Sequence, residues 1–336
     1  MTMSSDIPPH ATTGIGSLPY RESAPALNRA FAADIPYFPT LPSLDPHEGM
    51  LAQALTGFPG VYWKTGGDPR FEFSAWERGR EELAERLGRA FHRNRYLDFS
   101  PATSGGLWDL FVERASRHAG AWAKTQWLGP LTAVQALAGL EAAPRPKAME
   151  LVAQLAEWLF ARAVAMVSEL RRHGKEVLFF WDEPALGAAR TPLLDLAAEH
   201  LRERIGELRN YGARVGIHCC GRWDFEALPA WGLDFASFDL ALCGAALLAR
   251  PESLRKFRER AGRLALGLVP TSPPPAWNPR EEVEQWRARF AAALGAEEMK
   301  ALWSEAILTP ACGLGFRSVE EAERVFALLE ETKGCF

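Results

Sequence analysis

Short hydrophobic runs alternate with longer amphipathic segments along most of the chain, and this alternation predicts strands separated by helices. The apolar runs are rich in β-branched and aromatic residues and end at Gly, Pro or polar residues. Eight strands are predicted, at residues 11–19, 35–39, 122–128, 176–181, 214–218, 233–238, 263–269 and 305–312. Helical spacing of Leu and Ala predicts the main helices at residues 24–33, 148–172, 193–211, 279–294 and 318–332.

This order predicts an α/β protein built as a single (β/α)8 TIM barrel, because strands that alternate with helices pair in parallel through right-handed crossovers. Residues 43–120 contain more chain than one such unit requires. We interpret them as a long, mostly helical insertion after the second strand that decorates the barrel mouth, with helices near 47–56, 76–92 and 107–118 and a loop at 63–73. Flexible linkers do not bracket the insertion, so residues 1–336 are predicted to form one domain.

Composition and charge narrow the possible functions. The chain has 336 residues, 48% of them hydrophobic, and a net charge of −4. This charge gives no attraction for nucleic acid or for an anionic membrane. The N-terminus lacks the features of a signal peptide, and no apolar run reaches the roughly 18 residues of a membrane span, so we expect a cytoplasmic protein. Five cysteines, an odd number, indicate reduced thiols.

Residues able to do chemistry gather at the C-terminal ends of the predicted strands, which is where TIM barrels carry their active sites. They are Ser17, Asp182, Glu183, His218, Cys220, Asp239 and Cys312. Side chains alternate along a strand, so His218 and Cys220 are predicted to point the same way and Cys219 to pack behind the strand. Taken alone, a buried Cys or His is more often an ordinary core residue. Their shared position at one rim favours a metal site instead.

Zinc is the metal that suits these ligands. Two thiolates, an imidazole and a carboxylate match its usual tetrahedral donors, and sulfur disfavours Mg²⁺ or Ca²⁺. Thiolate ligands donate charge, which makes the activation of water a less natural role. Such a zinc binds a substrate thiol and keeps it deprotonated, so alkyl transfer to sulfur is the reaction class that follows.

Five motifs together resemble the catalytic barrel of cobalamin-independent methionine synthase, within the superfamily that includes uroporphyrinogen decarboxylase and corrinoid-dependent thiol methyltransferases. Their order along the chain also follows that family, and the resemblance covers nearly the whole chain except the segment 43–120. The motifs are TTGIGSLP at 12–19, GPLT at 129–132, WDEPAL at 181–186, HCCGRWDF at 218–225 and LTPACGLGFRSVEEAERV at 308–325.

The resemblance implies a zinc-dependent methyltransferase that converts homocysteine to methionine, with methyl-folate or a methyl-corrinoid protein as donor. The implied zinc ligands are His218, Cys220 and Cys312, with Asp239 where the family usually has glutamate. The implied catalytic residues are Asp182 and His218. The implied substrate-binding residues are the backbone of Ile15 and Ser17 for the carboxylate, and Asp182 with Glu183 for the ammonium group.

Two features depart from the family. The full-length family enzyme has two barrels, whereas this chain is long enough for one. On the second strand Asp182 has no clear partner, and Glu48 is a weak candidate.

Two alternatives stay open. The same zinc chemistry could act on another thiol or with a methyl-corrinoid protein. A metal-free, uroporphyrinogen-decarboxylase-like barrel would instead grip acidic groups through arginines such as Arg222 and Arg317.

Overall fold

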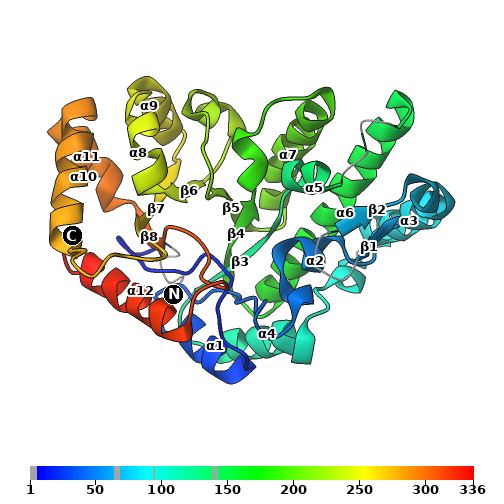
Figure 1. The fold of residues 1–336 in the computed structure, drawn as a ribbon, viewed down its shortest axis with the longest axis horizontal. Helices are drawn as coiled ribbons and strands as arrows, with labels where there is room; N and C mark the ends of the chain where they lie inside the picture. Colours follow the sequence, from blue (N-terminus) through cyan, green and yellow to red (C-terminus); the bar gives the residue numbers. More distant parts are fainter. Residues whose placement is uncertain (1–5, 64–68, 94, 138–139, 141–142) are drawn as a thin grey trace.

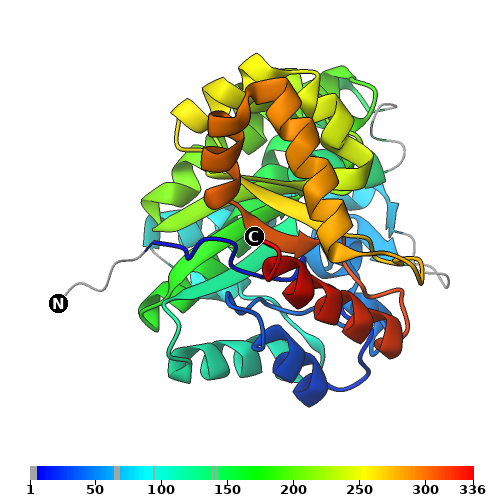
Figure 2. The same ribbon diagram turned by 90° about the vertical axis from the view of Figure 1, so that its left-hand side faces the viewer.

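Six parallel strands form one curled sheet at the centre of an α/β fold in the computed structural model of the chain (Figure 1). The structure describes residues 6–63, 69–93, 95–137, 140 and 143–336. The strands follow one another in chain order: β3 Trp122–Leu128, β4 Glu176–Asp182, β5 Ala213–Cys219, β6 Phe235–Asp239, β7 Arg263–Val269 and β8 Ile307–Pro310. Helices lie outside the sheet, as expected for parallel strands joined by helical crossovers (Figure 2).

Side chains on the two faces of this sheet enter two different cores. Along β4, Leu178 and Phe180 belong to a small inner cluster with residues from the starts of the other strands. Their neighbours Val177, Phe179 and Trp181 belong to the large outer cluster between sheet and helices. The alternation follows from the two-residue period of a strand. The concave face therefore has an apolar base, and Asp182 at the end of β4 lies above it.

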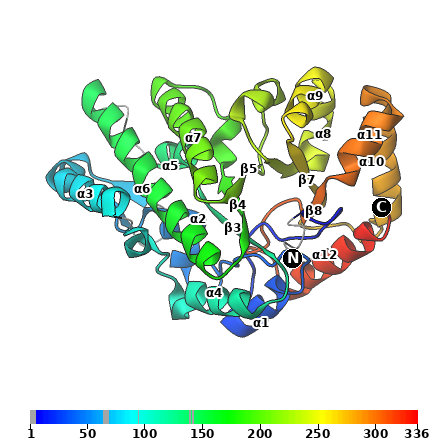
Figure 3. The same ribbon diagram turned by 180° about the vertical axis from the view of Figure 1, so that it is seen from behind.

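The main helices occupy the predicted regions. They are α1 Ser23–Ala30, α6 Arg145–Arg172, α7 Pro192–Asn210, α10 Pro279–Leu294 and α12 Val319–Lys333. Shorter helices, α5 Pro130–Ala136, α8 Leu240–Leu248, α9 Pro251–Glu259 and α11 Ala296–Ser304, complete the outer layer. Figure 3 shows α6 and α7 lying across the back of the sheet, where α6 contacts β3 and β4 and α7 contacts β5.

The first two predicted strands are extended segments held by isolated bridges, without a regular ladder. Residues 11–17 pair with β8 through the bridge between Thr12 and Leu308. Residues 35–40 pair with β3 through the bridge between Tyr37 and Lys124, and the two segments meet at the bridge between Ser17 and Thr40. Proline lacks the N–H that a ladder needs, and the second segment contains two prolines. This interrupts its pairing.

The segment 43–120 is more varied than predicted. It contains α2 Met50–Leu55, α3 Phe73–Arg93 and α4 Leu107–Arg117, close to the three expected helices. The predicted loop at 63–73 overlaps two short strands, β1 Val61–Trp63 and β2 Pro69–Phe71, which pair antiparallel. Its residues 64–68 lie outside the described part of the chain. Helix α3 packs on α6, whereas α2 contacts β3.

Helix α6 is long and apolar enough to cross a membrane by length and composition alone. However, 78% of its most apolar window is buried inside the protein. Its apolar surface is therefore used in contacts with the sheet and with α3, α5 and α7, as in the core helix of a folded domain.

Thr12 fastens the segment 11–17 to its neighbours, and its removal should weaken the fold. Its hydroxyl lies 2.9 Å from Asp34 Oδ2 and 3.0 Å from Glu330 Oε1. We expect Thr12→Val to lower the free energy of unfolding by about 1–2 kcal/mol, because the shape is kept while a buried hydroxyl is lost. Urea unfolding measures this. Ser116→Ala, which removes an exposed hydroxyl, is the control, and an equal loss in both variants would contradict the prediction.

Candidate metal centre

One imidazole and two thiols converge at the C-terminal ends of β5 and β8. One ligand atom from each of His218, Cys220 and Cys312 can be chosen so that all three atoms lie within 4.8 Å of one another. His218 is 5% exposed, and both cysteines are half-buried. Although the cysteines are far apart in sequence, parallel strands bring their ends to the same edge of the sheet. The structure thus brings together three of the four residues predicted as metal ligands.

The imidazole of His218 is held in one orientation. Its Nδ1 lies 2.9 Å from Ser237 Oγ, on the neighbouring strand β6, and the register pairs these two residues directly. Nε2 is buried and has no hydrogen-bond partner among the described residues. A buried ring nitrogen without a partner is costly, and a metal ion would satisfy it. Fixing the other ring nitrogen through a hydrogen bond is the usual arrangement for a metal-binding histidine.

The pKa values of the two thiols are shifted in opposite directions. The neighbouring Cys312 thiol and His218 ring lower the pKa of Cys220 to about 4, and burial opposes this shift. Hydrogen bonding to Cys220, followed by burial, raises the pKa of Cys312. Cys220 is therefore the thiolate of the pair, and thiolates are the form that binds metals. This donor set fits Zn²⁺, which takes sulfur and imidazole nitrogen.

Asp239, the fourth predicted ligand, has a different place. It ends β6, and its carboxylate accepts a hydrogen bond from the Leu242 N–H at 3.0 Å, as the N-cap of α8. It is not part of the three-residue group identified in the described chain. The reason is local: the chain turns directly from β6 into a helix, whose free N–H groups attract a short acidic side chain.

The two acidic residues at the end of β4 face different surroundings. Asp182 lines the cavity beside His218, and its Oδ1 is buried with no hydrogen-bond partner in the described chain. Burial raises the pKa of Asp182 to about 6, although the charges of His218 and Lys124 lower it. Asp182 is therefore free to accept a hydrogen bond from a ligand.

Glu183 was predicted to bind substrate, but its carboxylate holds the start of α5. It is fully buried and accepts hydrogen bonds from Leu131 N, Thr132 N and Thr132 Oγ1 at 2.6–2.9 Å. Burial raises its pKa to about 7, and these hydrogen bonds oppose the shift. Glu183 directly follows β4 and, unlike Asp182, is not among the described residues that line the cavity. The GPLT and DEP motifs thus meet in a structural contact.

A cavity of about 200 Å³ surrounds the three candidate ligands. Ile15 and Ser17, the residues predicted to bind a carboxylate, form part of its wall. The Ser17 hydroxyl accepts a hydrogen bond from Gly315 N at 3.2 Å, and the Ser17 carbonyl accepts one from Leu314 N at 2.8 Å. A Cβ on Gly313 would lie 2.3 Å from Ser17 Oγ. The loop after Cys312 is therefore packed directly on the segment that carries Ser17.

The sequence named Glu48 only as a weak candidate and did not single out Lys124. Glu48, a weak candidate, is 1% exposed and forms part of the wall, where it accepts hydrogen bonds from Gln53 Nε2 and Ser104 N. Beneath the cavity lies Lys124, 2% exposed, whose pKa burial lowers to about 7, while the charge of Asp182 opposes the shift. Lysine and Gln126 within the otherwise apolar run 122–128 were the signal that could have identified this polar inner face.

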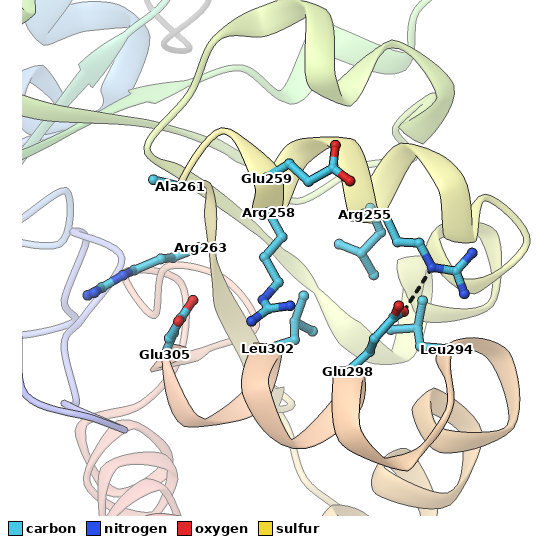
Figure 4. Close-up of a pocket in the computed structure, with 10 residues that line it drawn as sticks. Arg255, Arg258, Glu259, Ala261, Arg263, Leu294, Glu298, Leu302 and Glu305 are labelled. Atoms are coloured by element: carbon cyan, nitrogen blue, oxygen red, sulfur yellow. Dashed lines mark hydrogen bonds and ion pairs between the residues drawn. The ribbon is translucent and has the colours of Figure 1, made fainter.

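A second cavity, of about 480 Å³, lies near the N-terminal end of β7 between α9 and α11 (Figure 4). Its ten lining residues include three arginines and three glutamates but neither His nor Cys. Arg255 and Glu298 form an ion pair across it at 2.8 Å. Charges of opposite sign are balanced there, and the end of the sheet is the one that TIM barrels rarely use for catalysis.

Comparisons of the sequence find no matching family model and no matching curated protein. Solved structures do match. A B12-independent methionine synthase from Shewanella sp. W3-18-1, in complex with selenomethionine, aligns over 97% of both chains with a TM-score of 0.61 and 14% identity. A methyltransferase from Methanosarcina mazei aligns over 98% of this chain and 95% of its own, with a TM-score of 0.52 and 13% identity.

At such low identity the likeness concerns the fold. The structural neighbours are a B12-independent methionine synthase and a methyltransferase, and the first is of the family that the five motifs resemble. The chain therefore has a methionine synthase-like, methyltransferase-type fold.

The contact between Glu183 and α5 requires glycine at position 129, since a Cβ there would lie 2.1 Å from Glu183 Oε1. We expect Gly129→Ala to push this carboxylate from its three donors and to lower the free energy of unfolding by about 2–4 kcal/mol. Thermal or urea unfolding measures it. Gly206→Ala in α7, where a Cβ meets nothing within 4 Å, should be neutral or stabilising. Unchanged stability of Gly129→Ala would refute the prediction.

Proposed function

We propose that this protein is a zinc-dependent thiol S-methyltransferase that methylates homocysteine to methionine. The observation that carries the proposal is the meeting of His218, Cys220 and Cys312 in one cavity that Asp182 and Ser17 also line. The first group suits a soft metal, and the second offers partners for the two charged ends of an amino acid. The methyltransferase-type fold of the structural neighbours supports the same reaction class.

His218 Nε2 and the sulfurs of Cys220 and Cys312 would hold the zinc ion. Asp239 would have to leave the N-cap of α8 to join them, so we favour a three-residue set with the fourth position open to substrate. When bound, zinc supplies a Lewis acid that binds the substrate sulfur and lowers its pKa. Ser237 keeps the imidazole of His218 in the orientation that leaves Nε2 free for this role.

The remaining residues would bind and orient the amino acid. Asp182, with an unpartnered oxygen among the described residues, and Glu48 offer carboxylates to the substrate ammonium group. Backbone N–H groups around Ile15 and Ser17 would donate to its carboxylate. In the reaction, the thiol proton leaves to solvent, the sulfur lone pair forms the bond to the methyl carbon, and the bond between that carbon and the donor breaks with its electrons on the donor.

The methyl donor is either a methyl-folate or a methyl-corrinoid protein. Phe316 forms part of the cavity wall and is 93% exposed, so the cavity opens to solvent where a donor can approach. A metal-free, decarboxylase-like barrel is less well supported, because neither Arg222 nor Arg317 is among the described residues that line this cavity. Supplying each donor with homocysteine and measuring methionine separates the two donors.

The finer architecture is part of the proposal. We infer that segments 11–17 and 35–40 act as the first two strands of a closed (β/α)8 barrel. The bridges between Thr12 and Leu308, between Ser17 and Thr40 and between Tyr37 and Lys124 connect β8 to β3 through these two segments. Residues 1–336 would then form one domain with the insertion at about 43–120, acting in the cytoplasm on small molecules.

Zinc content tests the ligand assignment directly. Protein purified without added metal should contain about one zinc per chain, and His218→Ala and Cys312→Ser should each lose most of it, because loss of one of three ligands sharply weakens binding. Cys335→Ser, outside the cluster, should keep it. Elemental analysis on folded protein makes the measurement, and full metal in both ligand variants would end the assignment.

Asp182→Asn tests which thiol is bound. If Asp182 holds the substrate ammonium group, the variant should bind homocysteine about tenfold or more weakly, because a charged hydrogen bond is lost. Binding of 4-mercaptobutanoate, which has no ammonium group, should change little. Calorimetric titration of the zinc-loaded protein measures both affinities. Unchanged homocysteine binding would instead support a thiol without an ammonium group.

A further inference from the structure

We propose that Lys124 is a positioning residue that sets the selectivity of the site for thiols carrying a carboxylate. It acts by holding the carbonyl of Ile15 and thereby the backbone that faces the substrate. This inference rests on the proposed function, because it concerns how homocysteine would be recognised. None of the five motifs described above contains Lys124.

The contacts of Lys124 are specific. Its Nζ donates hydrogen bonds to Ile15 O at 2.6 Å and to Gln126 Oε1 at 2.9 Å. Gln126 Nε2 donates in turn to Phe38 O at 2.9 Å. One buried ammonium group therefore ties the two irregular segments, 11–17 and 35–40, to β3. These are the segments whose pairing is limited to isolated bridges, so the side-chain contacts supplement a sparse backbone ladder.

The position of Lys124 gives these contacts a functional consequence. Ile15 and Gln126 both line the cavity. Lys124 is 2% exposed and is not among the described residues that line it. It therefore acts on a ligand through Ile15. Holding the carbonyl of Ile15 fixes the orientation of the following peptide unit, because a peptide group is planar. The N–H groups beside the cavity are then presented in one arrangement.

The charges below the cavity also suit an amino acid. Lys124 is on β3 and Asp182 on β4, and the two interact electrostatically within the protein. The ammonium group of Lys124 lies against the segment proposed to bind a carboxylate. Asp182, a carboxylate, lines the part of the wall proposed to bind an ammonium group. Each end of a zwitterion would thus meet a buried charge of opposite sign, in a region where such charges are weakly screened.

A purely structural lysine would behave differently. Lys175 provides the comparison, because it is 6% exposed and donates to two backbone carbonyls, those of His118 and Gly120. It precedes β4 and lies away from the cavity. Removing either lysine should cost stability, since both satisfy buried carbonyls. Only removal of Lys124 should change which thiols are bound.

The experiment compares Lys124→Met with Lys175→Met and uses three thiols as probes. Homocysteine has both charged groups, 4-mercaptobutanoate lacks the ammonium group, and 3-aminopropane-1-thiol lacks the carboxylate. Calorimetric titration of each folded, zinc-loaded variant gives the affinities. We expect Lys124→Met to lower the affinity for the two carboxylate-bearing thiols by about tenfold. Its affinity for 3-aminopropane-1-thiol should stay within about twofold of the wild-type value. Lys175→Met should leave the relative affinities for the three thiols as they are in the wild-type protein.

The proposal would be overturned if Lys124→Met lowered the affinity for all three thiols equally, or for none of them. If Lys124→Met does not fold, the single variant Asp182→Asn is compared with the double variant that carries both Asp182→Asn and Lys124→Met. The double variant removes both charges of the pair, so neither is left buried alone. Its affinity for 4-mercaptobutanoate should be about tenfold lower than that of Asp182→Asn. Wild-type protein tests the proposed function separately. If the wild-type protein fails to bind zinc or homocysteine, the proposed function is refuted. If the wild-type protein binds both and Lys124→Met leaves the relative affinities for the three thiols unchanged, only the role of Lys124 is refuted.

Discussion

The parallel register of β4, β5 and β6 is the constraint on which the candidate site depends. It places Asp182 opposite His218 and His218 opposite Ser237. A parallel sheet fixes this row of inward-facing side chains without any contact between neighbours in sequence. A shift of one residue in β5 would turn His218 away and bring Cys219 inward. The grouping of the three candidate metal ligands is thus a consequence of strand pairing more than of any local motif.

Three buried ionisable groups near the candidate site have different hydrogen-bond partners. Lys124 and Asp182 lie at or beneath the cavity, and Glu183 is buried beside the start of α5; ionised groups in such places are expensive without partners. Glu183 is satisfied by three donors at the start of α5. Lys124 is satisfied by two acceptors. Asp182 keeps an oxygen without a partner in the described chain, which marks it as the group available to a ligand.

The sequence predicted the strands from 122–128 onward because each is a short run made up mainly of apolar residues, as in a sheet covered on both faces. It also predicted that His218, Cys220 and Cys312 would lie together, because each falls at or just after the end of such a run. It could not predict that Asp239 would cap α8 or that Glu183 would hold α5, since these depend on where the next helix begins. The inner role of Lys124 was hidden because one charge in an apolar strand has no periodicity of its own. The irregular pairing of 11–17 and 35–40 arises from long-range contacts that no local pattern records.

The packing of Ser17 against Gly313 and Gly315 mechanically couples two halves of the cavity that are remote in sequence. The same short loop follows Cys312, so displacement of the segment that carries Ser17 would be transmitted to one of the sulfurs. Any redesign of the cavity wall therefore has to preserve this contact or rebuild both sides of it together. The shape of the cavity and the position of the Cys312 sulfur therefore depend on the same packing contact.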